Sequence, residues 1–442
     1  MPKKKELTYL DVAEAWPRLT AGDRARRLKQ LPPDIGHEFF FDLSAADQAD
    51  VVLALPPAER RPWIRLLAPD DVADVIQAAP ADQRVGLLAL LDEPTRAEVT
   101  ALLAYAEDEA GGLMNPRYIR VRPEMSAAEA LSYFRRQAQQ RSGRDTPTYA
   151  YILDAEGKLV GQVALTDLIA GDPTTSVAQL MHTDIVTLPE EADQEVVAHV
   201  FAEHSLVAAP VVDSTGRMKG VVTADDVVAV VEEEATEDIQ KLGGSEALDA
   251  PYLKTALGRM VRKRAGWLAS LFLGEMLTAT AMGRFEQEIA RAVVLALFVP
   301  LMISSGGNSG SQASTLVIRA MALGEVRLRD WWHVMRREVG AGFALGCVLA
   351  IIGFLRILVW QAAGFGHYGL HYLAIAFTVA IALVGIVMWG TTAGAMLPFI
   401  LRRLGFDPAS ASAPFVATLV DVSGILIYFT VASLVLAGRL LP

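Results

Sequence analysis

The sequence predicts a multidomain membrane protein, and three observations lead to this fold class. Helix start signals recur at short intervals before residue 105, a pattern of strands and helices occurs twice between residues 115 and 235, and five apolar stretches follow residue 264. We therefore expect an all-α N-terminal helical superhelix, an α/β tandem pair of small domains, a connecting helix and a five-helix α transmembrane domain. The predicted boundaries are 1–112, 113–235, 236–263 and 264–442.

Charge divides the chain at the same place as hydropathy. Residues 1–262 hold 27 Lys and Arg against 43 Asp and Glu, a net charge of −16, whereas the rest of the chain is slightly basic. A surface this acidic argues against nucleic acid as a partner and favours cations. The N-terminus has no apolar core after its lysines, so we expect no secretory signal and a cytoplasmic acidic half. Cys347 has no partner cysteine, which excludes a disulfide framework.

The N-terminal part carries regularly spaced helix starts. Each start has a residue that is favoured at a helix N-terminus, and an acidic residue follows it within four positions. The starts lie about 11 to 14 residues apart, at Ser44, Pro57, Pro69, Pro80 and Pro94. Helices of two or three turns cannot bury an apolar face alone, so we expect them to stack into a superhelix.

The α/β part contains an internal repeat with an offset of 59 residues. The segment "YAYILDAEGKLVGQVALTDLIA" (149–170) matches "VAAPVVDSTGRMKGVVTADDVVA" (207–229). Each copy reads as a strand, an Asp-x-x-Gly turn, a second strand and a helix. The repeat resembles a tandem pair of CBS domains, which are regulatory modules that often hold an adenine nucleotide.

That resemblance also implies a nucleotide site. In the family, a Ser or Thr ahead of the last Asp of the copy helps to bind ribose, which points to Thr223 and Asp226 here. The first copy has Ala164 at the position of the hydroxyl residue. The resemblance therefore implies ATP or another adenine nucleotide as a ligand of the second copy, and a purely structural dimerisation module is the alternative.

Acidic residues cluster at both ends of the repeated part. Like charges four residues apart on a helix repel each other, so such a cluster is tolerated where water or a cation surrounds it. Mg²⁺ keeps most of its water shell and needs only one or two carboxylates. We expect regulatory Mg²⁺ at these acids, with a merely solvated surface as the alternative. The acids are Glu107, Glu109, Asp225, Asp226, Glu232, Glu234, Glu237 and Asp238.

Five apolar stretches are long enough to cross a hydrocarbon core of roughly 30 Å. Lys and Arg precede the first stretch and lie between the second and third and between the fourth and fifth, but not between the third and fourth. The positive-inside bias therefore predicts a multi-pass protein of the cytoplasmic membrane, with its N-terminus inside and its C-terminus outside. The stretches cover about 265–283, 289–323, 338–360, 372–401 and 413–437.

Ionisable residues inside these spans are the candidate ion ligands, because they are costly in lipid and usually face a cavity or each other. Glu275, Arg356 and Asp421 lie in the first, third and fifth spans. We expect Asp421 to hold the ion in the pore, with an ion pair to Arg356 as the alternative. The run "SSGGNSGSQAS" (304–314) predicts a helix that is broken beside a water-filled path.

Two membrane segments carry a more specific resemblance. "PLMISSGGNSGSQASTLVIRAMALGEV" and "PFVATLVDVSG" look like the MgtE family of magnesium channels, and the order of domains is similar over nearly the whole chain. The resemblance implies a homodimer in membrane lipid with the pore at its interface, Mg²⁺ as the transported divalent cation, and closure by the connecting helix when cytoplasmic Mg²⁺ is high. It implies a pore acid at Asp421 and pore-lining residues at Gly306, Gly307, Asn308, Gly310 and Ala417.

Two departures from the family concern conduction. Ser304 and Ser305 stand where the family has Gly and Thr, and Ala413 stands where some members have Asn. A CBS-regulated metal sensor and an anion channel of the chloride type are the alternative functions. The chloride type carries its CBS pair after the membrane domain, and its sites favour basic groups or hydroxyls. The chain shows no set of nucleophile, base and oxyanion donors, so we expect no enzyme.

Overall fold

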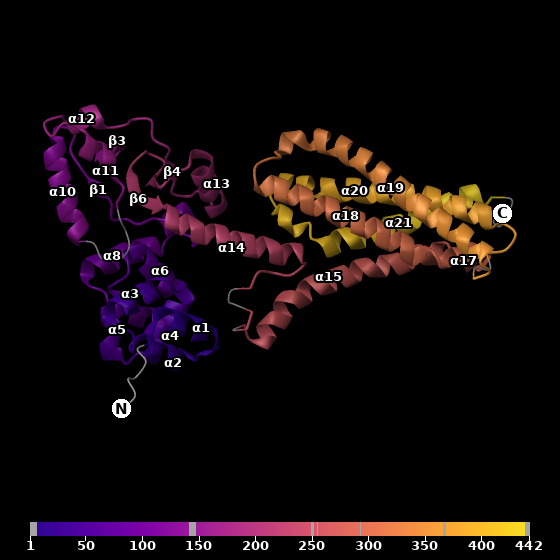
Figure 1. The fold of residues 1–442 in the computed structure, drawn as a ribbon, viewed down its shortest axis with the longest axis horizontal. Helices are drawn as coiled ribbons and strands as arrows, with labels where there is room; N and C mark the ends of the chain where they lie inside the picture. The colour runs from indigo at the N-terminus through magenta and orange to yellow at the C-terminus, as the bar shows by residue number, and fades with distance from the viewer. Residues whose placement is uncertain are drawn as a thin grey trace. The chain divides into compact units, whose positions relative to one another are not determined.

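The computed structural model describes residues 7–140, 147–248, 252–253, 255–291, 293–365 and 368–437. The chain divides into two compact units, Met1–Glu232 and Glu233–Pro442 (Figure 1). The first unit holds the short helices and the α/β part, and the second holds the apolar helices.

Short helices form the N-terminal part, as the start signals predict. Ser44 caps α4 by accepting the N–H of Asp47, and Pro57 and Pro69 open α5 and α6. Helices α2, α4, α6 and α8 pack on one another in succession, which buries their apolar faces in one core. The elements are α1 (Tyr9–Ala15), η1 (Trp16–Arg18), α2 (Ala21–Leu28), α3 (Pro33–Phe41), α4 (Ala45–Ala54), α5 (Pro57–Ile64), α6 (Pro69–Ala78), α7 (Ala81–Leu88) and α8 (Glu93–Leu102).

The α/β part has the predicted twofold repetition. Two three-stranded sheets have the orders β1-β2-β3 and β4-β5-β6, each with one parallel and one antiparallel pairing. In both turns a glycine has positive φ, Gly157 at 83° and Gly216 at 82°, and Asp154 and Asp213 accept backbone N–H groups of the turn. The elements are α9 (Ala110–Leu113), β1 (Ile119–Arg120), α10 (Ala127–Gln140), β2 (Tyr149–Leu153), β3 (Leu159–Ala164), α11 (Leu165–Ala170), α12 (Val177–Leu180), β4 (Leu188–Pro189), α13 (Gln194–His204), β5 (Ala208–Val212) and β6 (Met218–Thr223).

The predicted connecting segment, 236–263, is not one continuous helix in the described residues. Helix α14 (Ala224–Leu242) ends at a Gly-Gly pair in which Gly244 has a φ of 72°, and α15 (Leu257–Arg284) continues into the first apolar span. Residues 243–248 between the two helices are not helical. The positive φ at Gly244 stops α14 in the way that a C-terminal glycine commonly stops a helix.

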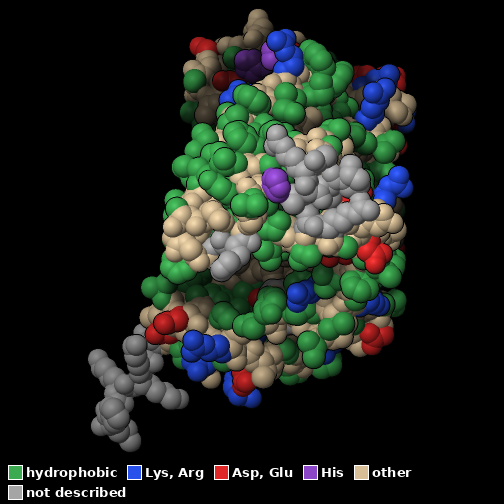
Figure 2. Space-filling model, turned by 90° about the vertical axis from the view of Figure 1, so that its right-hand side faces the viewer, with side chains coloured by type: hydrophobic (Ala, Val, Ile, Leu, Met, Phe, Trp, Pro, Cys, Tyr) green, Lys and Arg blue, Asp and Glu red, His purple; other side chains and the backbone are tan. Residues whose placement is uncertain are grey.

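Five helices in the described part of the chain are long and apolar enough to cross a membrane, in agreement with the sequence. Helices α18, α19, α20 and α21 pack on one another, and α15 lies along α21 (Figure 1). Hydrophobic side chains cover much of the upper half of the face that Figure 2 shows. The remaining elements are α16 (Glu286–Arg291), α17 (Val293–Ala296), α18 (Val299–Ala322), η2 (Leu328–Asp330), α19 (Trp331–Ala362), α20 (Tyr372–Arg403), η3 (Pro408–Ser410) and α21 (Ala413–Val435).

The prediction of a broken helix at 304–314 is wrong, because α18 runs unbroken through this segment. Its small residues serve close packing instead. A Cβ on Gly394 of α20 would lie 2.1 Å from the carbonyl oxygen of Gly310, so the two helix backbones nearly touch. The hydroxyls of Ser311 and Ser314 donate to the carbonyls of Ala413 and Ala411 at 3.0 Å each, and these bonds fix the start of α21 against α18.

Candidate functional site

The Asp421 carboxyl lies where α21 passes α18. Ser412 caps α21 by accepting the N–H of Phe415, and Asp421 follows about two turns later, half-buried. A Cβ added to Gly307 of α18 would lie 3.3 Å from the Ala417 Cβ and 3.7 Å from Asp421 Oδ1. The absence of a side chain at Gly307 therefore leaves the carboxylate directly beside the backbone of α18.

The structure separates the predicted pore-lining residues into two groups. Gly307 and Ala417 lie beside Asp421, and Asn308 is exposed, with its amide donating to the Ser304 hydroxyl at 3.3 Å. Gly306 and Gly310 are buried, and each would bring a Cβ into contact with α20 or α21. Gly306 and Gly310 therefore serve helix packing within the chain, whereas Asn308 and the Asp421 carboxyl reach a surface.

Arg356 has partners other than Asp421. Its guanidinium donates to the Tyr368 hydroxyl at 3.2 Å and lies 4.8 Å from the ring centre of Trp360. No ion pair within the described residues joins it to Asp421. The alternative of a structural Arg356–Asp421 salt bridge is therefore wrong.

The first group of predicted regulatory acids lies at the start of α14. The Thr223 hydroxyl lies 2.5 Å from Asp225 Oδ1 and 2.7 Å from Asp226 Oδ2, and the Thr223 N–H also donates to Asp226. Burial, and then the charge of Asp225, raise the pKa of Asp226 well above its usual value, and Asp71 of α6 adds to this effect. Asp71 was not among the predicted residues, since nothing in the sequence places α6 beside α14.

The second group lies at the end of α14 and includes a residue that the sequence did not single out. Lys241 Nζ lies 2.5 Å from Glu237 and 2.6 Å from Asp407, which precedes η3. Burial raises the pKa of Asp238 to about 6, and the charges of Asp407 and Glu234 add to this effect. One lysine thus stands among four carboxylates from two segments that are far apart in the sequence.

The other predicted acids lie apart from these groups. Glu232 is on the exposed side of α14, and Glu107 is exposed ahead of α9. Glu109 is half-buried and accepts the N–H of Ala106 at 3.3 Å. No group of three or more His, Cys, Asp or Glu side chains with the geometry of a direct metal site occurs in the described residues.

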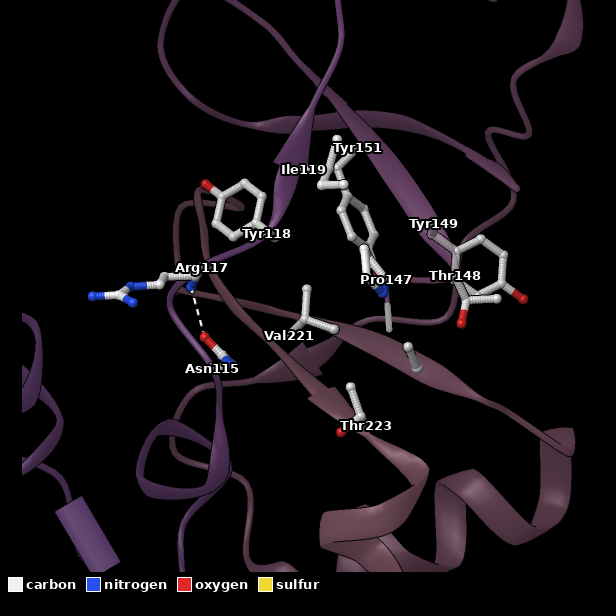
Figure 3. Close-up of a pocket in the computed structure, with 11 residues that line it drawn as sticks. Asn115, Arg117, Tyr118, Ile119, Pro147, Thr148, Tyr149, Tyr151, Val221 and Thr223 are labelled. Carbon is white, nitrogen blue, oxygen red and sulfur yellow. Dashed lines mark hydrogen bonds between the residues drawn. The ribbon is translucent and has the colours of Figure 1, made fainter. Parts of the chain in front are cut away.

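A small cleft lies between the two repeats of the α/β part (Figure 3). Tyr118, Tyr149 and Tyr151 of the first repeat and Val221 and Thr223 of the second line it. The Tyr151 hydroxyl is buried without a hydrogen-bond partner among the described residues, and burial raises its pKa. The cleft therefore offers aromatic rings and hydroxyls, with Arg117 at its edge, to a flat polar ligand.

Comparisons with known proteins cover most of the chain. The sequence matches the MgtE intracellular N domain over residues 7–108, CBS domains over 110–172 and 177–233, and MgtE, described as a divalent cation transporter, over 299–431. The magnesium transporter MgtE of Thermus thermophilus is 44% identical over 347 residues, which are 78% of this chain and 74% of that protein. The magnesium transporter MgtE of Enterococcus faecalis is 30% identical over 76% of this chain and 71% of that protein.

One solved structure is similar to the first part of the chain. It is a crystal structure of the cytosolic domain of the Mg²⁺ channel MgtE in complex with ATP. Its sequence is 40% identical, the match covers 51% of this chain and 91% of that chain, and the TM-score is 0.47.

Proposed function

Because the chain belongs to the MgtE family of divalent cation transporters, we propose that it is a magnesium-selective channel or transporter for Mg²⁺ uptake across the cytoplasmic membrane. The family is one of transporters, so the chain is not an enzyme. The observation that supports the Mg²⁺ path is the Asp421 carboxylate, which lies at membrane depth beside the bare backbone at Gly307.

Selectivity follows from the charge of Asp421 in a homodimer. If the twofold axis runs along the path, two Asp421 carboxylates face each other and repel strongly unless a cation lies between them. A divalent ion neutralises both charges, and Mg²⁺ gives up its waters reluctantly, so the carboxylates hold a hydrated ion through its water shell. The side-chain oxygen of Asn308, whose amide N–H donates to Ser304, accepts a hydrogen bond from that shell.

Mg²⁺ uptake into proteoliposomes tests the proposed path. Asp421→Ala should lose Mg²⁺ uptake while the protein still folds and dimerises, whereas the control Glu338→Gln, at a half-buried acid of α19, should retain it. Chloride uptake by the wild type would favour an anion channel, and no uptake of either ion would favour a sensor. Normal Mg²⁺ uptake by Asp421→Ala would remove this residue from the mechanism.

Gating by cytoplasmic Mg²⁺ is proposed from the acids of α14. Asp238, Glu234 and Asp407 share a half-buried region in which burial, and then the like charges, raise the pKa of Asp238. Mg²⁺ relieves that repulsion and stabilises the contact of α14 with the segment before α21, which closes the path. Asp226→Asn combined with Glu234→Gln should then raise the Mg²⁺ concentration needed for closure, and an unchanged Mg²⁺ dependence would exclude these two positions as sensors.

Nucleotide binding, orientation and assembly complete the proposal. ATP or another adenine nucleotide is the proposed ligand at the cleft lined by Tyr151 and Thr223, and calorimetric titration of ATP into wild type and Thr223→Ala tests this. The N-terminus is cytoplasmic and the C-terminus is outside, so a cysteine at Phe365, between α19 and α20, should react with reagents from outside only.

The protein is a homodimer without nucleic acid partners, and its domains are 1–112, 113–235, 236–263 and 264–442.

A further inference from the structure

Glu275 is an acidic residue at membrane depth for which the Asp421 site alone gives no role. It lies in the apolar part of α15, and its side chain is exposed on the single chain. Its exposed neighbours are apolar, with Phe272, Leu273 and Met276 between 55% and 67% exposed. A carboxylate in contact with lipid is strongly disfavoured, so this residue requires either water or a charged partner.

No protein group neutralises Glu275 within the described part of the chain. It makes no hydrogen bond or ion pair with the described residues, in contrast to Arg356, which has both Tyr368 and Trp360 as partners. The same helix carries a second unsatisfied group, since the Thr278 hydroxyl is buried without a hydrogen-bond partner one turn further on. Two oxygen-bearing side chains of α15 thus lack partners at the same depth.

Packing brings this part of α15 next to the Asp421 site. A Cβ on Gly274 would lie 2.8 Å from the Thr418 methyl group, so α15 and α21 approach closely there. Thr418 is one helical turn before Asp421 on α21. Glu275 follows Gly274 directly in α15, so this contact places the two acidic residues on adjacent helices within about one turn of each other.

We propose that Glu275 is a second acid of the cation path, which attracts hydrated divalent cations from α15 and passes them to Asp421. The proposal rests on the proposed role of Asp421. Glu275 is an outer ligand in this scheme: it binds the water shell of Mg²⁺ and raises the local concentration of the ion, while Asp421 holds the ion in the path.

Mg²⁺ uptake by proteoliposomes that contain a Mg²⁺-sensitive dye tests this role. Glu275→Gln should raise the Mg²⁺ concentration for half-maximal uptake about three- to tenfold, because one charge near an ion path changes local cation concentration by about that much or more. It should also weaken the dependence of uptake on ionic strength. Glu275→Asp should resemble the wild type, and the control Glu286→Gln, an exposed acid at the start of α16, should have no effect. An unchanged half-maximal concentration and salt dependence in Glu275→Gln would overturn the proposal.

Charge can also be changed after folding, which separates the proposed role from a folding defect. Glu275→Cys is made in a Cys347→Ser background. Its Mg²⁺ uptake should rise after reaction with a thiosulfonate that adds a negatively charged sulfonate. Its uptake should fall after reaction with a thiosulfonate that adds a positively charged quaternary ammonium. Equal effects of the two reagents, or no reaction of the thiol from water, would place Glu275 in lipid or in a protein contact and refute its role. Normal uptake by Asp421→Ala would instead refute the pore site itself, whatever the result at Glu275.

Discussion

Gly394→Ala tests whether the close approach of α18 and α20 supports the proposed ion site at Asp421. The added Cβ would clash with the Gly310 carbonyl oxygen, well inside the 3.0 Å that real Cβ atoms keep from other heavy atoms. Because the neighbour is backbone, no rotamer change relieves the contact, and the helices must move apart. Overpacking of this kind costs about 1–3 kcal/mol. In an open helix position the same change would instead gain about 1 kcal/mol from helix propensity.

The matched control is Gly340→Ala on α19, where an added Cβ meets nothing within 4 Å. Thermal unfolding in detergent should show Gly394→Ala less stable than the wild type and Gly340→Ala equal to it or more stable. Mg²⁺ uptake should fall only in Gly394→Ala, because a shift of α18 moves Gly307 away from Asp421. Equal stability of the two variants would refute the assignment of these glycines to helix packing.

Three further predictions concern the end of α14 and the membrane core. Lys241→Met leaves Glu237 and Asp407 without their shared lysine, so amide exchange at the end of α14 should become faster. The control Lys219→Met should leave this exchange unchanged, because the ion pair of Lys219 with Asp213 lies in the first unit. The pKa of Asp238 is raised from 3.8 to about 6, so its favourable contribution is complete below pH 4 and is lost as the pH rises through 6. The protection factors of amides at this end of α14, which correct for base-catalysed intrinsic exchange, should therefore be higher at pH 5 than at pH 7.5 in the absence of Mg²⁺. Asp238→Asn should remove this difference, and an equal pH dependence of the protection factors in the variant would contradict the reasoning. Tyr428→Phe removes a buried hydrogen bond of 2.9 Å from the Tyr428 hydroxyl to the Leu295 carbonyl. Thermal unfolding should show a loss of stability of about 1 kcal/mol, and no loss would mean that water replaces that hydrogen bond.

The elements that the sequence predicts well are those with local causes. Ser44 caps its helix through an atom three residues away, and Gly157 and Gly216 occupy turns that only need the neighbouring Asp. Apolar length likewise depends on each span alone, so the five membrane helices follow from composition. Each of these signals lies within one short segment, which makes it readable without knowledge of the fold.

The glycine run at 304–314 shows why other features require the structure. A small side chain permits a helix to break, and it equally permits a second backbone to approach. Which of the two occurs depends on Gly390 and Gly394 of α20, about eighty residues further along the chain, whose backbones meet those of Gly306 and Gly310. With such a partner in place the helix keeps all its backbone hydrogen bonds, and this outcome is the more stable one in lipid.

The candidate ion ligands divide in the same way. Asp421 is recognisable from sequence as a candidate, because a carboxylate in an apolar span is costly and therefore rare. Asp407 is not, because an acid before Pro in a loop is an ordinary helix cap, and its side chain does accept the N–H of Ala409. Only the fold brings Lys241 and Asp238 to the same carboxylate and gives it a second role. For an acidic protein of this kind, the sequence therefore identifies the acids that are costly where they stand, and the structure identifies those that act through their neighbours.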